Sequence, residues 1–75
     1  MPGSLLLWPN PTSGAVTVEH ANGLNKLRIR DTYGRLILIV TNTDHFDTAG
    51  WARGIYFVES LEAKGDRIIA RLMVE

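Results

Sequence analysis

Apolar and polar residues alternate over several short segments of the chain. In Val16–Glu19 and in Lys26–Arg30 every second residue is apolar, which is typical of a strand with one face buried and the other in solvent. The same alternation divides Arg67–Val74 into a core-facing set, Ile68, Ala70, Leu72 and Val74, and an outward-facing set, Ile69, Arg71 and Met73. We therefore predict a long terminal strand with one face in the core and the other on the surface.

Two further segments are apolar without interruption. Leu36–Val40 and Ile55–Val58 are too short for helices, are rich in β-branched or aromatic residues, and follow a glycine within two positions. This composition predicts strands that are more deeply buried than the alternating ones.

Turn-forming residues separate these segments. Glycine, proline, asparagine and aspartate gather between them, at spacings that leave only tight connections. No segment places apolar residues at helical spacing over three turns, and Asp44–Trp51 has room for one helical turn at most. We expect strands at Leu5–Trp8, Ala15–Glu19, Leu27–Asp31, Leu36–Thr41, His45–Asp47, Gly54–Leu61 and Arg67–Val74. The pattern predicts an all-β fold, a seven-stranded antiparallel immunoglobulin-like β-sandwich.

The length allows one small domain. The chain has 75 residues, of which 45% are hydrophobic, and no cysteine, so disulfides and thiolate metal sites are excluded. Residues 1–4 are interpreted as an expression leader, which leaves 5–75 as the domain. A sandwich of this size fills its interior with its own side chains, which argues against a ligand cavity and against most enzyme chemistry.

The charges of the chain cancel. Eight lysines and arginines balance eight aspartates and glutamates, so the long-range field on which nucleic-acid and anionic-membrane binders depend is not expected. The longest apolar run, Leu36–Val40, is far shorter than the roughly 20 residues of a membrane helix. The first residues have no basic region of the kind that begins a signal peptide. We expect no nucleic-acid partner and no membrane insertion.

Few residues suggest chemistry. His45 lies between Asp44 and Asp47, a cluster that can ligate a metal or orient a base, and the two aspartates offer too few ligands for a recognised calcium loop. We interpret His20 and His45 as exposed residues at strand ends. No nucleophile elbow and no phosphate-binding glycine series occurs, so we expect no catalytic residue, no metal and no cofactor.

Two other groups allow two interpretations each. Lys26, Arg28 and Arg30 share one strand face, either as a ligand-binding stripe or, as we favour, as a solvated face with an acidic residue opposite on a neighbouring strand. Trp8 and Trp51 are able to stack on a sugar ring, but packing at the core or at a sheet edge is the favoured role.

Three motifs occur in order along the chain, at the spacing of a sandwich: Trp8–Gly14 (WPNPTSG), Asp31–Arg35 (DTYGR) and Gly54–Val58 (GIYFV). In this respect the chain resembles the type A C-terminal sorting domain of the type IX (Por) secretion system of Bacteroidetes. The resemblance extends from about Leu5 to Glu75. It places the family motif at Pro9, Asn10, Pro11, Gly34, Gly54 and Tyr56.

The resemblance implies a non-catalytic address label. Such domains lie at the C-terminal end of a larger cargo, are read by an outer-membrane translocon after transit through the periplasm, and are commonly removed by a cell-surface sortase that attaches the cargo to lipopolysaccharide. The expected location is therefore the outer-membrane surface or the extracellular space. The alternative is an immunoglobulin-like accessory module of a secreted enzyme, which binds carbohydrate or a neighbouring domain. A weak homodimer through an exposed sheet edge is left open.

The motif residues also have physical roles. Pro9 and Pro11 fix two φ angles, and the side chain of Asn10 is expected to bond the backbone of its own turn. Gly34 is expected to supply the positive φ of a hairpin, and Gly54 to allow close backbone approach.

Two further expectations concern side chains at the C-terminal end of the domain. The hydroxyl of Tyr56 is expected to tie down a loop. The outward-facing Ile69, Arg71 and Met73 combine apolar area with a planar donor, which is the composition of a contact patch. We predict that the translocon recognises this patch or the free edge beside it.

Overall fold

The computed structural model describes residues 5–20, 26–41, 43–61 and 67–75, with only the backbone of His20. The predicted leader at 1–4 and the turns at 21–23 and 64–66 lie outside the described residues. The described strands are β1 (Leu5–Trp8), β2 (Ala15–His20), β3 (Lys26–Asp31), β4 (Leu36–Thr41), β5 (His45–Asp47), β6 (Gly54–Leu61) and β7 (Arg67–Val74). All seven expected strands are confirmed, and β2 and β3 are each one residue longer than predicted. In the described ranges there is no helix, and hence none that is long and apolar enough to cross a membrane.

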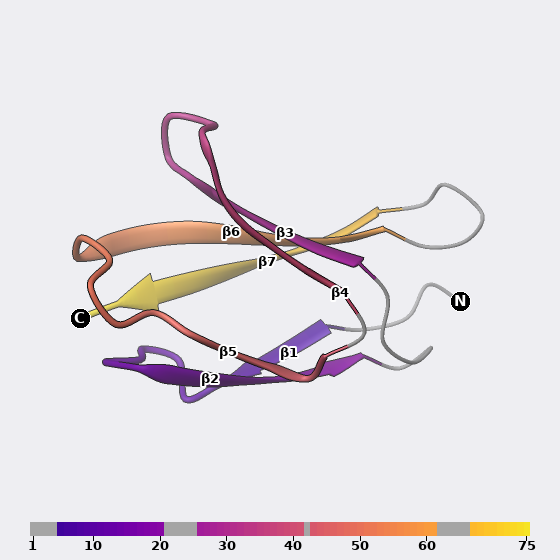
Figure 1. The fold of residues 1–75 in the computed structure, drawn as a ribbon, viewed down its shortest axis with the longest axis horizontal. Helices are drawn as coiled ribbons and strands as arrows, with labels where there is room; N and C mark the ends of the chain where they lie inside the picture. Colours follow the sequence, from indigo (N-terminus) through magenta and orange to yellow (C-terminus); the bar gives the residue numbers. More distant parts are fainter. Residues whose placement is uncertain (1–4, 21–25, 42, 62–66) are drawn as a thin grey trace.

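The strands form two sheets that lie one above the other (Figure 1). One sheet has the order β1-β2-β5 and the other the order β4-β3-β6-β7, and every named pairing is antiparallel. The connection between β1 and β2 joins the two sheets, because Thr12 forms a parallel bridge with Val74 of β7.

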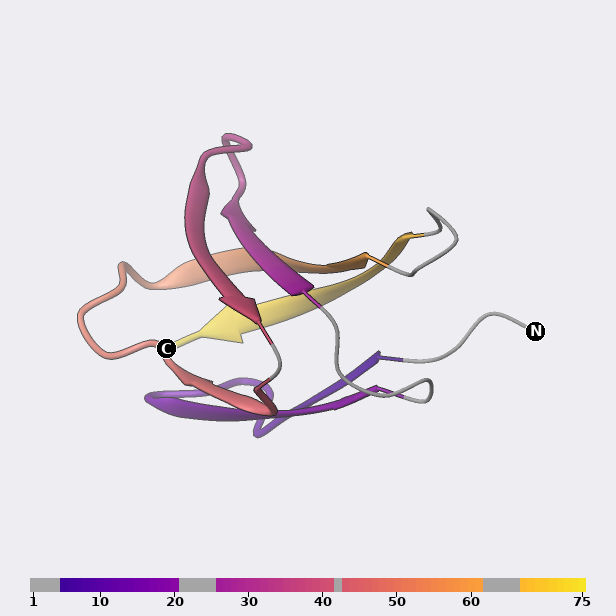
Figure 2. The same cartoon turned by 45° about the vertical axis from the view of Figure 1, so that its right-hand side comes forward.

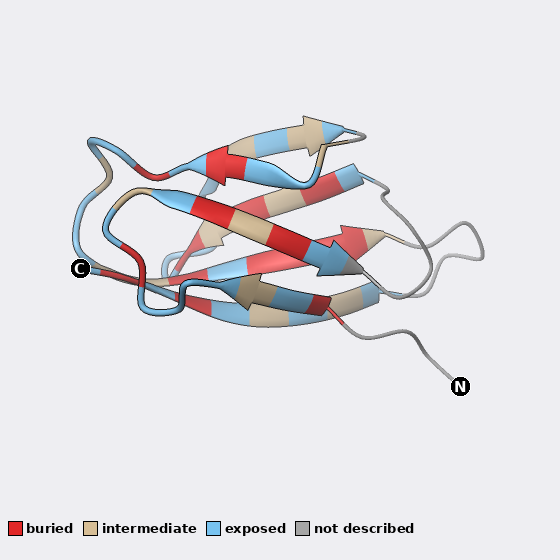
Figure 3. Ribbon diagram, turned by 90° about the horizontal axis from the view of Figure 1, so that it is seen from below, coloured by how far each residue is buried: buried red, intermediate tan, exposed pale blue. Residues whose placement is uncertain are grey.

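The core lies between the sheets and comes from the inward side of each strand. Figure 3 shows buried and exposed positions alternating along several strands. The buried apolar residues are Leu5, Val16, Val18, Leu27, Ile29, Phe46, Tyr56, Val58, Leu72 and Val74. In β7, Leu72 and Val74 are buried and Ile68 and Ala70 are half-buried, whereas Ile69, Arg71 and Met73 are exposed. The predicted faces of the last strand are confirmed.

The expectation of burial at Leu36–Val40 is wrong. This run forms β4, an edge strand in which Leu36, Ile37 and Ile39 are 46%, 38% and 43% exposed. Ile55–Val58 is only partly as expected, because Phe57 faces outward and is 38% exposed. Hydropathy measures how apolar a strand is, but its burial depends on which strands and which sheet lie against it.

Candidate functional site

Asn10 connects the first motif to the last strand. Its Nδ2 donates a hydrogen bond to the carbonyl oxygen of Arg71 at 2.9 Å, and its Oδ1 accepts one from the backbone N–H of Met73 at 3.0 Å. The expectation that Asn10 bonds its own turn is therefore wrong. Pro9 and Pro11 flank Asn10 with cis peptide bonds at Trp8–Pro9 and Asn10–Pro11, and the amide of Asn10 reaches β7 instead.

The backbone of Thr12 continues the contact with β7 toward the C-terminus. Its backbone N–H donates to the carbonyl oxygen of Met73 at 2.9 Å, and its own carbonyl oxygen accepts from the N–H of Glu75 at 2.8 Å. In antiparallel sheets alternate residues direct their backbone groups away from the paired strand. Arg71 and Met73 are such residues in β7, and Glu75 directly follows the strand. The Pro9–Thr12 segment thus covers the outer edge of β7 along its C-terminal half, where an unpaired edge would otherwise be open to other chains.

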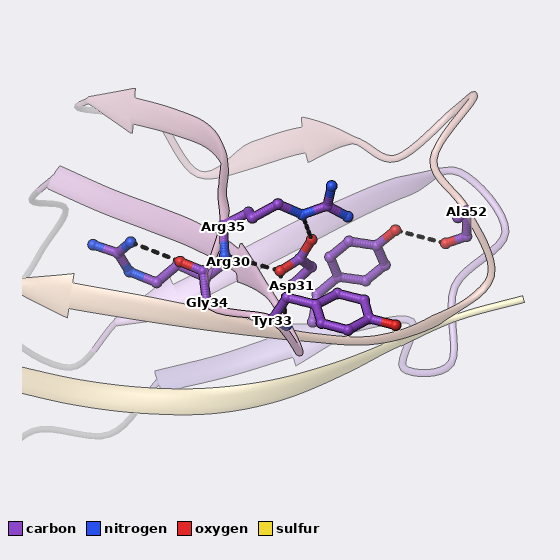
Figure 4. A network of polar contacts seen from close by, with 7 residues as sticks. Arg30, Asp31, Tyr33, Gly34, Arg35 and Ala52 are labelled. Carbon is purple, nitrogen blue, oxygen red and sulfur yellow. Dashed lines mark hydrogen bonds and ion pairs between the residues drawn. The ribbon is translucent and has the colours of Figure 1, made fainter.

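The second motif builds the hairpin between β3 and β4 (Figure 4). The Asp31 carboxylate accepts hydrogen bonds from the backbone N–H groups of Tyr33 and Arg35, both at 2.9 Å, and from Nε of Arg35 at 2.7 Å. Burial by itself would raise the pKa of Asp31, but these hydrogen bonds outweigh it and hold the pKa below its ordinary value. Gly34 has a φ of 83°, so the predicted positive φ is confirmed and Asp31 is the residue that organises the turn.

The third motif anchors the connection between β5 and β6. The Tyr56 hydroxyl donates to the carbonyl oxygen of Ala52 at 2.7 Å, which confirms that it ties down a loop. The Tyr56 ring lies 5.1 Å from that of Trp51, which in turn stacks on Phe46 at 6.0 Å. Core packing is thereby confirmed for Trp51, while Trp8 is 44% exposed.

Gly54, the first residue of β6, is required for a different reason than expected. A Cβ at Gly54 would meet no atom within 4 Å, so close backbone approach is not the reason for glycine. Its φ of 142° is the reason, because side-chain-bearing residues rarely adopt it.

The outward-facing residues of β7 lie beside those of β6. Arg71 is opposite Phe57, and Met73 is opposite Ile55. One partly open pocket is lined by Asn10, Pro11, Ile55, Arg71 and Met73. Ile69, which is 57% exposed, lies nearer the start of β7 and does not contribute to the lining. The structure thus brings Arg71 and Met73 together with the first motif and leaves Ile69 apart.

Of the three basic residues of β3, Arg28 lies opposite an acidic residue, as the favoured interpretation predicts, whereas Lys26 and Arg30 lie opposite Leu61 and Phe57. Arg28 is opposite Glu59 in the register of β3 and β6, and its Nε lies 3.2 Å from Glu59 Oε1. Arg67 of β7 binds the other oxygen of the same carboxylate at 3.1 Å. Glu59 is only 6% exposed although it lies on the outer side of the sheet. The sequence pattern gives no sign that Glu59 lies beside Arg28, because alternation assigns a residue to a face of its strand and only the register of β3 and β6 brings the two together.

His45 lies at the exposed start of β5, as predicted. Its Nδ1 is 3.0 Å from Asp44 Oδ1, and this hydrogen bond lowers the pKa of Asp44. Across the described ranges no three histidine, aspartate or glutamate side chains gather closely enough to hold a metal ion. The side chain of His20 lies outside the described residues.

Comparison with known families supports the resemblance seen in the sequence. The family model of the secretion system C-terminal sorting domain matches residues 6–75, nearly the whole chain. The chain belongs to this family. The searches of curated proteins and of solved structures gave no significant match.

Family membership confirms the resemblance to type IX sorting domains. This sorting domain implies an N-terminal cargo, the type IX secretion machinery, and export to the cell surface or the extracellular space. Sorting-signal domains of this family are in general non-catalytic.

Proposed function

We propose that this sorting domain is the translocon-binding label of a larger cargo, acting without a catalytic residue, metal or cofactor of its own. The cargo passes through the periplasm, the outer-membrane translocon binds the domain, and a cell-surface sortase then attaches or releases the cargo. The observation that carries this proposal is the family match over residues 6–75. We also assign the two facing sheets to the immunoglobulin-like class of sandwich, on the basis of seven short antiparallel strands.

The recognition surface that we propose is the outward-facing set Ile69, Arg71 and Met73. Ile69 and Met73 are 57% and 38% exposed, and Arg71 lies between them on the same face. The backbone edge beside Arg71 and Met73 is occupied by Asn10 and Thr12. Contact with this half of β7 therefore takes place through side chains and not through strand addition.

The family motif residues have a different role in this proposal. Asn10 and Tyr56 make the hydrogen bonds described above, and Gly34 and Gly54 have positive φ. We infer that the six motif residues, Pro9, Asn10, Pro11, Gly34, Gly54 and Tyr56, shape the domain and present β7, while the translocon contacts the outward-facing side chains.

A reporter directed to the periplasm and fused to this domain tests the proposal in a host with the type IX machinery. The unaltered fusion should reach the cell surface or the medium. A fusion with Ile69, Arg71 and Met73 all replaced by threonine should remain periplasmic, with a melting temperature close to that of the unaltered domain.

The matched control replaces Leu6 and Arg53 by threonine, which removes an exposed aliphatic side chain and an exposed guanidinium elsewhere. This control should be exported. Normal export of the folded triple variant would place recognition on another surface. Retention of the unaltered, folded fusion would contradict the sorting function itself.

The alternative of a carbohydrate-binding accessory module has weaker support. Trp51 packs between Phe46 and Tyr56, which leaves Trp8 as the exposed indole of the described residues. A single ring offers one stacking position for a sugar.

A further inference from the structure

The two edges of the four-stranded sheet differ. At β7 the C-terminal half of the edge is hydrogen-bonded to Asn10 and Thr12. At β4, the rose strand to the left of β3 in Figure 2, no described strand pairs beyond Leu36–Thr41. Edge strands usually carry a charge, a proline or a bulge that discourages pairing. β4 has neither a charged residue nor a proline, although a register shift lies near its start.

The backbone of β4 is ready to pair. The backbone N–H and C=O of Met73 point away from β6 and bond Asn10 and Thr12. Because the direction of these groups alternates along each strand, the registers of β7, β6, β3 and β4 place the backbone groups of Leu38 and Val40 toward β3. The N–H and C=O groups of Ile39 and Thr41 then point toward the open edge. The groups of Ile39 lie beyond the register shift at Leu36–Leu38, in the regular part of β4, and can form hydrogen bonds with an added antiparallel strand.

We propose that the strand added to β4 is β4 of a second copy of this chain, related by a two-fold axis at Ile39. The two four-stranded sheets then join into one continuous sheet. This register is self-complementary, because it places Leu38 opposite Val40 of the partner subunit on the core side. On the outer side it places Ile37 opposite Thr41 of the partner subunit, so that each face of the joined sheet keeps its character.

Burial favours this contact. Leu38 and Val40 contact the core yet are only half-buried, and Ile39 is 43% exposed. Cross-strand neighbours on both faces remove apolar surface from water that the isolated domain leaves exposed.

Charge favours a second copy over a charged partner segment. β4 has no charged residue and so offers no ion pair to a charged strand, which makes an uncharged strand such as β4 itself the better match. The chain has a formal net charge of zero, and therefore two copies do not repel one another at long range. The basic β3 strands of the two copies are three strand spacings apart, about 14 Å, which exceeds the screening length of about 8 Å at physiological salt.

The assembly closes at two copies. An isologous contact uses the β4 edge of both subunits, and the C-terminal half of the opposite edge is already covered by Asn10 and Thr12. The contact therefore produces a dimer and not a growing fibre. The proposed dimer depends on the exposed edge of β4 and not on the sorting function.

The first test is the mass of the purified 75-residue chain in solution, measured over a dilution series from millimolar to micromolar concentration. The expected mass at high concentration is about twice the 8.4 kDa of one chain. Ile39→Lys should reduce it to that of one chain, because a charge on the edge opposes pairing. Ile69→Lys adds the same charge to an exposed site on β7 and should keep the dimer.

The second test does not depend on a destabilising change. The chain has no cysteine, so Ile39→Cys introduces a single thiol at the two-fold axis. Opposite residues of a hydrogen-bonded antiparallel pair are about 5.5 Å apart at Cα, a distance that a disulfide spans. Mild oxidation should link two chains through Ile39→Cys much faster than through Ile69→Cys.

Three results would overturn the dimer. One is the mass of a single chain at every concentration, and another is a doubled mass that persists in folded Ile39→Lys. The third is equal cross-linking at positions 39 and 69. If β4 pairs with a different protein and not with itself, the purified chain should have the mass of a single chain at every concentration.

Discussion

Replacing Asn10 by alanine tests whether the first motif holds the edge of β7. The substitution removes both side-chain hydrogen bonds, to the carbonyl oxygen of Arg71 and from the N–H of Met73. A net intramolecular hydrogen bond contributes about 0.5–1.5 kcal/mol to stability. Asn10 is exposed, so water reaches the freed backbone groups, and the expected loss lies in the lower half of the summed range, about 1–2 kcal/mol.

The melting temperature reports this loss. In a domain of this length 1 kcal/mol corresponds to about 4–8 °C, so Asn10→Ala should lower the melting temperature by roughly 5–15 °C. Ser13→Ala is the matched control. Ser13 is exposed in the same connection, and no hydrogen bond of its side chain is found among the described residues. It should change the melting temperature by no more than a few degrees.

Hydrogen exchange locates the effect. In Asn10→Ala the amide of Met73 should exchange much faster, because its acceptor is gone, while the amide of Leu72, which faces β6, should keep its protection. An unchanged melting temperature together with unchanged exchange at Met73 would refute our account of the motif. A general loss of protection at Leu72 as well would show that Asn10 stabilises the whole sheet and not one edge.

Three further changes test the core, a loop anchor and a turn. Leu72→Ala empties a fully buried position and should cost about 2–5 kcal/mol in a denaturant titration, enough to unfold much of a marginal domain; a cost typical of a surface site would contradict the assigned faces. Tyr56→Phe keeps the ring but removes the hydroxyl bonded to Ala52, and calorimetry should show a loss of about 0.5–1.5 kcal/mol, whereas an unaltered melting curve would assign the loop to other contacts. Because the folded pKa of Asp31 lies below the ordinary value of 3.8, its stabilising contribution is complete above that pH and is lost as the pH falls through the folded pKa. The stability difference between the wild type and Asp31→Asn should therefore shrink in acid, and a difference independent of pH would show that the charge of Asp31 has no role.

The sequence was sufficient for the positions of the strands. Each strand is defined by residues within itself and by the turns that bound it, and alternation has a period of two wherever one face is buried. This is why the two faces of β7 were predicted residue by residue, and why Gly34 was placed correctly at the β3–β4 hairpin. The pairing of Arg28 with an acidic neighbour followed from the same logic.

The tertiary structure decided which strands lie at an edge and which residues meet across the fold. Leu36–Val40 reads as a buried strand, yet β4 is outermost in its sheet, and no pattern within five residues reveals the order of strands. The partners of Asn10 are still farther away along the sequence, because the chain passes through β2, β3, β4, β5 and β6 before it reaches β7. Contacts of this kind depend on how the two sheets close over one another, and that arrangement is a property of the whole chain and not of any one segment.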